Sequence, residues 1–449
     1  MNKLFNVLLV FLSVTLFSCA GLQRGSEKSL MQPEKELCFL FTNCTMGMLE
    51  PEGCGCRQQG GLSKRSGLIT ETREKEKKVL VFDTGNILSD KDIVPDKDKT
   101  VYTLIALNKM EIDALNIGAY DAVSSRFLKQ KEPKLVFPLV SANIKSIPTK
   151  ERIFKPYTIK ESQGIKIGIF GLTGDHPNPM VLKNKDIFID DPVQEAAETV
   201  ARLKTEGCDI IILLSQLNDT ENIKVTKQVQ GIHFIFGSSS KTAQERTKTV
   251  ENTMIFSPGT KGKKAALIKT AFRGAVNSFY DISTKNDLEE RLKNLEEKNR
   301  EKSEDIASEK SEIESRLRSF NNKNSCTCDT IILNKNIKDD NRIMLLIEKY
   351  KRIRLRKNIP DYKNSISAVD LSGLDEEKKL MALRLMNEIK CYQDLNIASL
   401  ADMEPYCKKL ADIIVSRVST GESEGKIRYR VLQKKEQNKK NLDKNYLFQ

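Results

Sequence analysis

The sequence predicts an α/β domain that is followed by a long charged helical segment and a mostly helical C-terminal region. Between Leu37 and about Ser283, apolar runs of strand length alternate with helix-like stretches, which is the pattern of buried strands covered by helices. The strands end in Gly, Asn, Ser or Asp, and functional loops of such domains follow the carboxyl ends of the strands. From Asp287 to Phe320, leucine and isoleucine recur at helical spacing in a highly charged background.

The N-terminus is typical of a secretory signal with a lipoprotein-type cleavage site. Lys3 precedes an apolar run from Leu4 to Leu16, and "LFSC" ends at Cys19, which would become the lipidated first residue. An ordinary signal peptide is the alternative, because Phe17 is bulky for its position. Both interpretations export the chain, and the run is short for a transmembrane helix. We expect a lipoprotein of the bacterial cell envelope, facing the periplasm or in the outer membrane, with the membrane as its partner through the lipid on Cys19.

The α/β domain is predicted to span residues 36–284, after a signal at 1–19 and a polar tether at 20–35. Its strands and helices fall in "KVLVFDTGN", "LIALNKMEIDALNIGAYDAV", "LVFPLVSANI", "IKIGIFGLTG", "DPVQEAAETVARLKTEGCDIIILLS" and "IHFIFGSSS". One helix begins clearly at Asp191, an acidic cap followed by proline in the first turn. Ala196, Val200 and Leu203 then form its apolar face.

The charged segment 285–322 is predicted to be a long helix or short coiled coil, with Asn299 and Lys302 interrupting its apolar seam. It either dimerises the protein or folds back on its own domain. A helical C-terminal domain at 323–424 includes a helix capped by Ser399, with Leu410, Ile414 and Val418 on its apolar face and residue 421, a glycine, at its end. The last segment, 425–449, is a solvated basic tail, and attraction to anionic lipid is a secondary possibility. The net charge is +13, but no nucleic acid partner is expected for an exported chain.

Ten cysteines in an exported chain make disulfides possible, and without Cys19 an odd number remains. The disulfide candidates are Cys54, Cys56, Cys326, Cys328, Cys391 and Cys407. The two Cys-x-Cys pairs among them are an alternative source of four sulfurs for a zinc or iron–sulfur site. There are only two histidines, which limits metal and acid–base chemistry. His233 falls inside an apolar strand and is expected to be structural.

Several short motifs occur in a fixed order along residues 36–283. These are "TNCTMG", "DTGN", "GAYDAV", "PLVSANI", "IKIGIFGLTG", "DIIILLSQLND" and "GIHFIFGSSSK". The order resembles the N-terminal domain of the 5′-nucleotidase branch of calcineurin-like metallophosphoesterases. The resemblance implies a metallophosphoesterase-like β-sandwich flanked by helices. The C-terminal nucleotide-recognition domain of that family has no visible counterpart here.

The resemblance also implies where the metal ligands would stand, and this sequence carries other residues there. Cys44 and Met46 stand for the first Asp and His, and Asn86 for the bridging Asp. Gln216, Ser239 and Lys241 stand for three later histidines. Arg126 falls where the family has an Asn-His pair, while Asn43 and Asp83 match positions beside the ligands. The predicted vestigial cleft therefore consists of Asn43, Cys44, Met46, Asp83, Asn86, Arg126, Gln216, Ser239 and Lys241.

These replacements argue against two-metal chemistry. Amide oxygens without negative charge cannot hold two divalent cations together, and Lys241 beside such an ion adds repulsion. We therefore predict a binding or structural lipoprotein without catalysis or a metal cofactor. The alternative is a divergent phosphoesterase or nucleotidase that hydrolyses phosphate esters of nucleotides, with Zn, Mn or Mg held by Cys44 and Asn86. The "CGC" loop is interpreted as a disulfide staple on the rim of the cleft, bonded to Cys44 or another neighbour, with thiol redox chemistry as the minor alternative.

Overall fold

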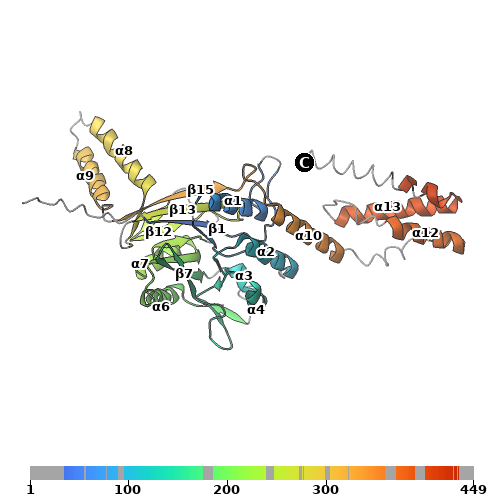
Figure 1. Ribbon diagram of the computed structural model, residues 1–449, viewed down its shortest axis with the longest axis horizontal. Coiled ribbons are helices and arrows are strands. Elements are labelled where there is room, and N and C mark those ends of the chain that lie inside the picture. The colour runs from blue at the N-terminus through green and yellow to red at the C-terminus, as the bar shows by residue number, and fades with distance from the viewer. Residues whose placement is uncertain are drawn as a thin grey trace, which may run out of the picture.

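A computed structural model describes residues 35–54, 57–76, 78–88, 96–174, 186–238, 247–272, 276, 278–298, 304–321, 323–358, 371–389, 400–427, 429–431 and 433. Within them, two large sheets face each other (Figure 1). One has seven strands in the order β14-β15-β13-β1-β2-β3-β4, the other has six in the order β11-β12-β10-β9-β7-β6, and β5 pairs with β8 separately. The predicted α/β sandwich flanked by helices is confirmed.

The strands are β1 (Lys35–Thr42), β2 (Val79–Asp83), β3 (Ala114–Asn116), β4 (Leu139–Val140), β5 (Ile144–Ser146), β6 (Tyr157–Ser162), β7 (Ile165–Thr173), β8 (Ile187–Ile189), β9 (Ile210–Gln216), β10 (Phe234–Phe236), β11 (Lys248–Val250), β12 (Thr253–Phe256), β13 (Lys264–Phe272), β14 (Phe279–Asp281) and β15 (Asn324–Ile332). The helices are α1 (Leu62–Lys75), α2 (Lys97–Met110), α3 (Ala119–Ala122), α4 (Ser125–Lys131), α6 (Pro192–Thr205), α7 (Asp219–Gln228), α8 (Ile282–Lys298), α9 (Glu304–Arg318), α10 (Asn341–Asn358), α12 (Glu376–Ile389) and α13 (Leu400–Ser419).

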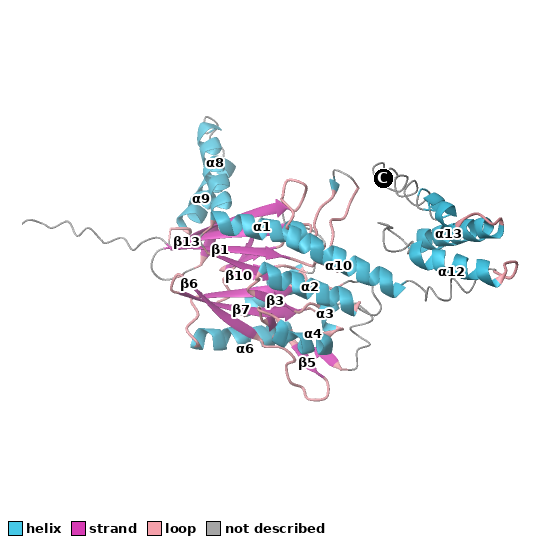
Figure 2. Ribbon diagram, turned by 45° about the vertical axis from the view of Figure 1, so that its right-hand side comes forward, coloured by secondary structure: helices cyan, strands magenta, loops and turns pink. Residues whose placement is uncertain are grey.

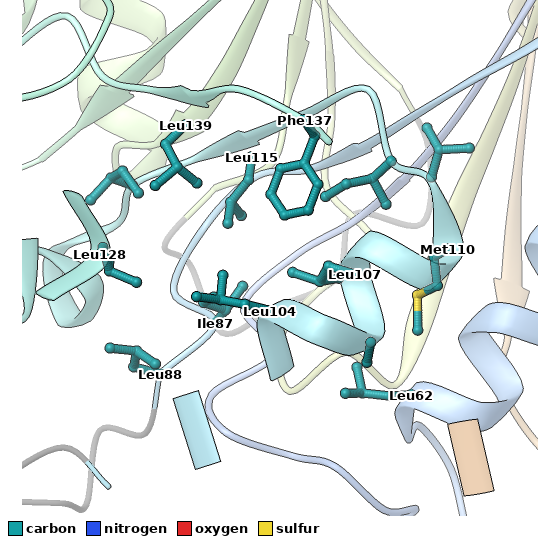
Figure 3. Close-up of a cluster of buried hydrophobic side chains, with 14 of the residues drawn as sticks. Leu62, Ile87, Leu88, Leu104, Leu107, Met110, Leu115, Leu128, Phe137 and Leu139 are labelled. Atoms are coloured by element: carbon teal, nitrogen blue, oxygen red, sulfur yellow. The ribbon is translucent and has the colours of Figure 1, made fainter. Parts of the chain in front are cut away.

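Three hydrophobic clusters separate the layers of the domain. Between the sheets, the rings of Phe39, Phe234 and Phe236 pack together, with ring centroids 5.8 to 5.9 Å apart. The outer face of the seven-stranded sheet is covered by α1, α2 and α10, as Figure 2 shows. Figure 3 shows Leu104 and Leu107 of α2 in that cluster. On the other side, α6 and α7 cover the six-stranded sheet. The central strands β1, β7, β9 and β10 are buried on both faces along most of their length, which explains their nearly continuous apolar runs.

The parallel register places the ends of the central strands together. In the first sheet, Thr42 at the end of β1 lies opposite Asp83 at the end of β2. In the second sheet, Thr173 at the end of β7 lies opposite Gln216 at the end of β9. The loops that follow these strands therefore meet at one edge of the sandwich.

The helix predicted to begin at Asp191 is confirmed as α6. The Asp191 carboxylate accepts hydrogen bonds from the backbone N–H groups of Val193 and Gln194, at 2.8 and 2.9 Å. These bonds satisfy two N–H groups that the helix leaves unpaired, and the proline that follows lacks one. The predicted apolar face, including Val200 and Leu203, is buried against the six-stranded sheet.

The structure differs from the predicted domain boundary at residue 284. The strand β15 pairs with β13 along eight residues, and α10 packs on α1 and α2, so residues 324–358 belong to the sandwich and not to a separate helical domain. Alternating polar residues in "NSCTCDTII" concealed this strand, because only one of its faces is buried.

The charged segment forms two helices rather than one long helix. The helices α8 and α9 lie side by side as a hairpin that projects from the sandwich between β14 and β15 (Figure 1). Ion pairs join Arg291 to Glu309 and Lys310 to Glu296 across the two helices. The predicted interruptions of the apolar seam fall between α8 and α9, outside the described residues. The two helices pair with each other in the hairpin, so dimerisation through this segment stays a prediction.

The C-terminal helices α12 and α13 share a small apolar cluster that includes Leu385, Leu410, Ile414 and Val418. The last three are the predicted apolar face of the helix, and Gly421, at φ 74°, follows its end as predicted. No helix in the described part of the chain is both long enough and apolar enough to cross a bilayer.

Candidate functional site

The loops after β1, β2 and β9 bring four of the predicted cleft residues into one buried hydrogen-bond network. Asn43, Cys44, Asn86 and Gln216 are all at most 3% exposed. The amide oxygen of Gln216 accepts from the Cys44 thiol at 3.1 Å and from Asn86 Nδ2 at 2.6 Å. The amide nitrogen of Gln216 donates to Asn43 Oδ1 at 2.7 Å. Gln216 thus connects the two sheets through its own side chain.

The other polar atoms of this network also have partners. Asn43 Nδ2 donates to the carbonyl oxygens of Ser238 and Gly259, at 2.9 and 2.8 Å. Asn86 Oδ1 accepts the backbone N–H of Tyr120 at 3.0 Å. Thr84, which the sequence analysis did not assign to the site, donates to Asn43 Oδ1 at 2.5 Å. The network is therefore closed within the protein.

The backbone at the site adopts a conformation that L-residues rarely take. Cys44, Met46 and Asn86 have φ angles of 49°, 50° and 56°, in the left-handed region. Backbone hydrogen bonds hold the loops after β1 and β2 in this shape. The Cys44 N–H donates to the Gly85 carbonyl oxygen at 3.2 Å, and the Met46 N–H donates to the Asn86 carbonyl oxygen at 2.8 Å. Such residues cost about 1–3 kcal/mol each and concentrate at functional sites. The loop geometry of a functional site is thus present without charged ligands.

Asp121 supports the loop after β2 and is a further residue that was not predicted to belong to the site. Its carboxylate accepts backbone N–H groups of Asn86, Leu88 and Gly118 at 2.7 to 3.0 Å. Burial raises the pKa of Asp121 to about 7, although these hydrogen bonds oppose the shift. The signal for its role was the sequence "GAYDAV", in which Asp121 stands three residues after a glycine cap.

Asp83 lies beside the network and is held by Arg65 of α1. Arg65 Nη1 donates to Asp83 Oδ2 at 2.7 Å, and the two side chains are 3% and 1% exposed. Arg65 Nη2 also donates to Thr45, in the loop after β1. Asp83 further accepts from Thr42 Oγ1 and from the backbone N–H of Gly85. This carboxylate is therefore committed to an internal ion pair.

The residues present do not fit a pair of divalent ions. In the described part of the chain, no group of three or more His, Cys, Asp or Glu side chains is arranged to hold a metal ion. Burial raises the pKa of the Cys44 thiol to about 12, so the thiol is neutral near pH 7. The oxygens of Asn43, Asn86 and Gln216 already accept protein hydrogen bonds. Two-metal catalysis needs negative ligands that hold both ions, and this set supplies none.

The remaining predicted cleft residues either lie outside the network or fall outside the described residues. Met46 is half-buried next to the network. Arg126 does not join it: its side chain is 82% exposed on α4 and pairs with Asp186 at 3.6 Å. Ser239, Lys241 and the predicted lipidation site Cys19 lie outside the described residues.

The disulfide predictions need correction. Cys54, Cys326 and Cys328 are free thiols, and so is Cys44, so the proposed staples at these positions are wrong. Cys54 is exposed on its loop, whereas Cys44 and Cys326 are buried and Cys328 is half-buried, so Cys54 lies in a different environment from the other three thiols. Cys56, Cys391 and the side chain of Cys407 lie outside the described residues.

His233 is structural, as predicted. Its Nδ1 accepts the backbone N–H of Ile211 at 3.0 Å, and its ring packs edge-on against Phe279. Burial lowers the pKa of His233 to about 4, so the imidazole is neutral at physiological pH.

Known proteins resemble this chain over part of its length. No protein-family model matches the chain. Protein UshA of Yersinia enterocolitica is 36% identical over 124 residues, which are 26% of this chain and 22% of that protein. A 5′-nucleotidase of Vibrio parahaemolyticus is 31% identical over 175 residues, which are 36% of this chain and 30% of that enzyme. The chain therefore spans less than a third of the length of these two curated relatives.

Solved structures show the same fold. The 5′-nucleotidase precursor of Thermus thermophilus matches with a TM-score of 0.52 at 16% identity, over 72% of this chain and 59% of that one. The sulfate thiohydrolase SoxB of the same organism matches with a TM-score of 0.52 at 11% identity, over 70% and 60%. The comparisons consistently indicate the 5′-nucleotidase and calcineurin-like phosphoesterase family for the N-terminal part of this chain. The predicted resemblance is confirmed.

Proposed function

We propose that this chain is an exported lipoprotein whose phosphoesterase-like domain has a binding or structural role and does not hydrolyse phosphate esters. The observation that supports the absence of hydrolysis is the closed network of Asn43, Cys44, Asn86 and Gln216. Export rests on the N-terminal sequence alone. A metal ion would have to displace the hydrogen bonds of these buried amides, and each unsatisfied buried group costs about 1–3 kcal/mol. Neutral ligands return too little energy to offset that cost.

Metal analysis tests the proposal directly. Protein purified without chelator should contain less than one equivalent of zinc, manganese or iron, and should not hydrolyse a nucleoside monophosphate or an aryl phosphodiester with added Mn²⁺. A variant carrying Cys44→Asp, Met46→His, Asn86→Asp and Gln216→His restores the family's ligand types at these four positions and serves as the comparison for metal uptake. Two equivalents of metal in the wild-type protein would sink the proposal.

The same measurements decide the alternative of a divergent phosphoesterase with one ion at Cys44 and Asn86. Hydrolysis that requires metal and disappears in Cys44→Ala would establish it. Cys208→Ala is the matched control, because Cys208 is a half-buried thiol next to α6 and outside the network.

Anchoring and self-association are separate parts of the proposal. Lipid on Cys19 would tether the chain to a membrane, and Cys19→Ala should move the protein from the membrane fraction to the soluble fraction and abolish labelling with a palmitate analogue. Self-association through residues 285–322 would appear as a dimer in sedimentation. Ion pairs join α8 to α9, and Ile313 of α9 is 5% exposed. Leu288, Leu292 and Leu295 of α8 are half-buried and are the apolar side chains that a dimer would cover.

A further inference from the structure

A cluster of sulfur atoms lies at the opposite end of the sandwich from the amide network. Cys326 of β15 lies opposite Thr270 of β13, and Thr270 lies opposite Leu37 near the amino end of β1. The amide network follows the carboxyl end of β1, beyond Thr42. Cys328 stands two residues further along β15 and faces the same way, because side chains alternate along a strand.

Both cysteines face the space between the two sheets. Cys326 is 1% exposed within the inter-sheet cluster, and Cys328 is half-buried against the same cluster. Met254 of β12 comes from the facing sheet and is fully buried. The Cys326 Sγ and Met254 Sδ atoms are 3.3 Å apart. Cys326 therefore contacts a thioether from the facing sheet, and the second free thiol, Cys328, lies two residues away on the same face of β15.

We propose that Cys326, Cys328 and Met254 form a binding site for one monovalent soft metal ion, namely Cu(I). Thiolate and thioether ligands select Cu(I) over harder cations. Residues two apart on a strand have Cα atoms about 6.7 Å apart. Two metal–thiolate bonds of roughly 2.3 Å, the length known for zinc, can span that separation once both side chains turn toward one ion.

The surroundings distinguish this site from one for a divalent ion. Asp281 of β14 lies next to the cluster, but its carboxylate already accepts from Thr247 Oγ1 and from the N–H and hydroxyl of Ser283. Zinc would lack a fourth ligand, whereas Cu(I) is satisfied by soft ligands alone. The half-buried Cys328 gives an ion a route from solvent.

Binding is coupled to proton release. Burial raises the pKa of both thiols well above the ordinary range, so both carry protons when no metal is bound. Each thiol that coordinates forms a sulfur–metal bond as its S–H bond breaks, and the proton goes to solvent. No change in the oxidation state of the metal or the sulfur is needed, provided that copper is supplied as Cu(I).

Competition with a chromophoric Cu(I) chelator tests the site in the reduced full-length chain under anaerobic conditions. A background of Cys54→Ser and Cys56→Ser removes the other Cys-x-Cys pair. We expect the background protein to take one equivalent of Cu(I) from the chelator. Cys328→Ser and Met254→Leu should each weaken binding by at least about tenfold. Cys208→Ser changes a half-buried thiol that packs against the outer cluster beneath α6 and not between the sheets, so it should leave the affinity unchanged.

Circular dichroism of each variant checks that the fold is intact, and Met254→Leu keeps nearly the same volume in the core. X-ray absorption of the loaded protein should show a first shell of sulfur only. The proposal is overturned if the background protein takes no Cu(I), if Cys328→Ser and Met254→Leu lose no more affinity than Cys208→Ser, or if the copper shell contains nitrogen or oxygen.

Discussion

The buried ion pair between Arg65 and Asp83 offers a quantitative test of how the loops of the site are held. Arg65→Met keeps much of the aliphatic volume but removes the cation. The Asp83 carboxylate, 1% exposed, is then left with hydroxyl and backbone N–H donors and no opposite charge. Removing one partner of a buried ion pair costs about 3–5 kcal/mol. Because those donors remain, we expect a loss of about 3 kcal/mol in the free energy of unfolding.

Lys75→Met is the matched control for this change. Lys75 lies on the same helix and pairs with Glu71, but the two side chains are 67% and 45% exposed. A pair of this kind contributes about 0–0.5 kcal/mol. The chain has no tryptophan, so urea unfolding is followed by far-UV circular dichroism and extrapolated linearly to water. Equal losses in Arg65→Met and Lys75→Met would refute the reasoning, and Arg65→Met combined with Asp83→Asn should recover part of the loss.

Three further predictions concern the packing around the site. Gln216→Leu leaves Asn86 Nδ2 with only the Cys44 thiol, 3.8 Å away. The free energy of unfolding measured in urea should therefore fall by about 1–3 kcal/mol. The raised pKa of Asp121 means that the folded state binds its proton more tightly than the unfolded state. Stability should therefore fall from about pH 4 to about pH 7, with a flatter profile in Asp121→Asn. In Gly67→Ala the new Cβ would lie 1.8 Å from the Lys338 carbonyl oxygen, in the loop before α10, so the Tm should fall. Gly373→Ala meets no atom within 4 Å and should leave the Tm unchanged.

The sequence was sufficient for the sandwich because its strands are buried on both faces and its helices carry clear caps. "KVLVFDTGN" and "DIIILLSQ" became β2 and β9, and the polar residues at their ends met as expected. The strand β15 could not be recognised, because its partner β13 lies about fifty residues earlier and its two cysteines suggested a different role. Pairing over such distances leaves no local pattern.

The hydrogen bonds of the site could not be predicted from residue types alone. Asn, Cys and Gln at ligand positions indicate only that negative charge is missing. Gln216 joins Asn43, Cys44 and Asn86 into one network only because the two sheets place these side chains within hydrogen-bond distance, 2.6 to 3.1 Å. Residue types do not determine positions to that precision. The disulfide predictions failed for the same reason, since the number and spacing of cysteines do not determine which thiols come within bonding distance.

The position of β1 in the middle of the seven-stranded sheet has a consequence for how the chain must fold. Its antiparallel neighbour β13 begins at Lys264, and the layer is complete only when α10 ends at Asn358. One side of β1 therefore stays unpaired until residues more than 220 positions further along the chain are available. A nascent chain would therefore expose a long apolar strand edge to chaperones or to other chains. A fragment that ends near residue 284 lacks β15, so the edge of β13 that β15 covers would stay unpaired. We expect such a fragment to aggregate.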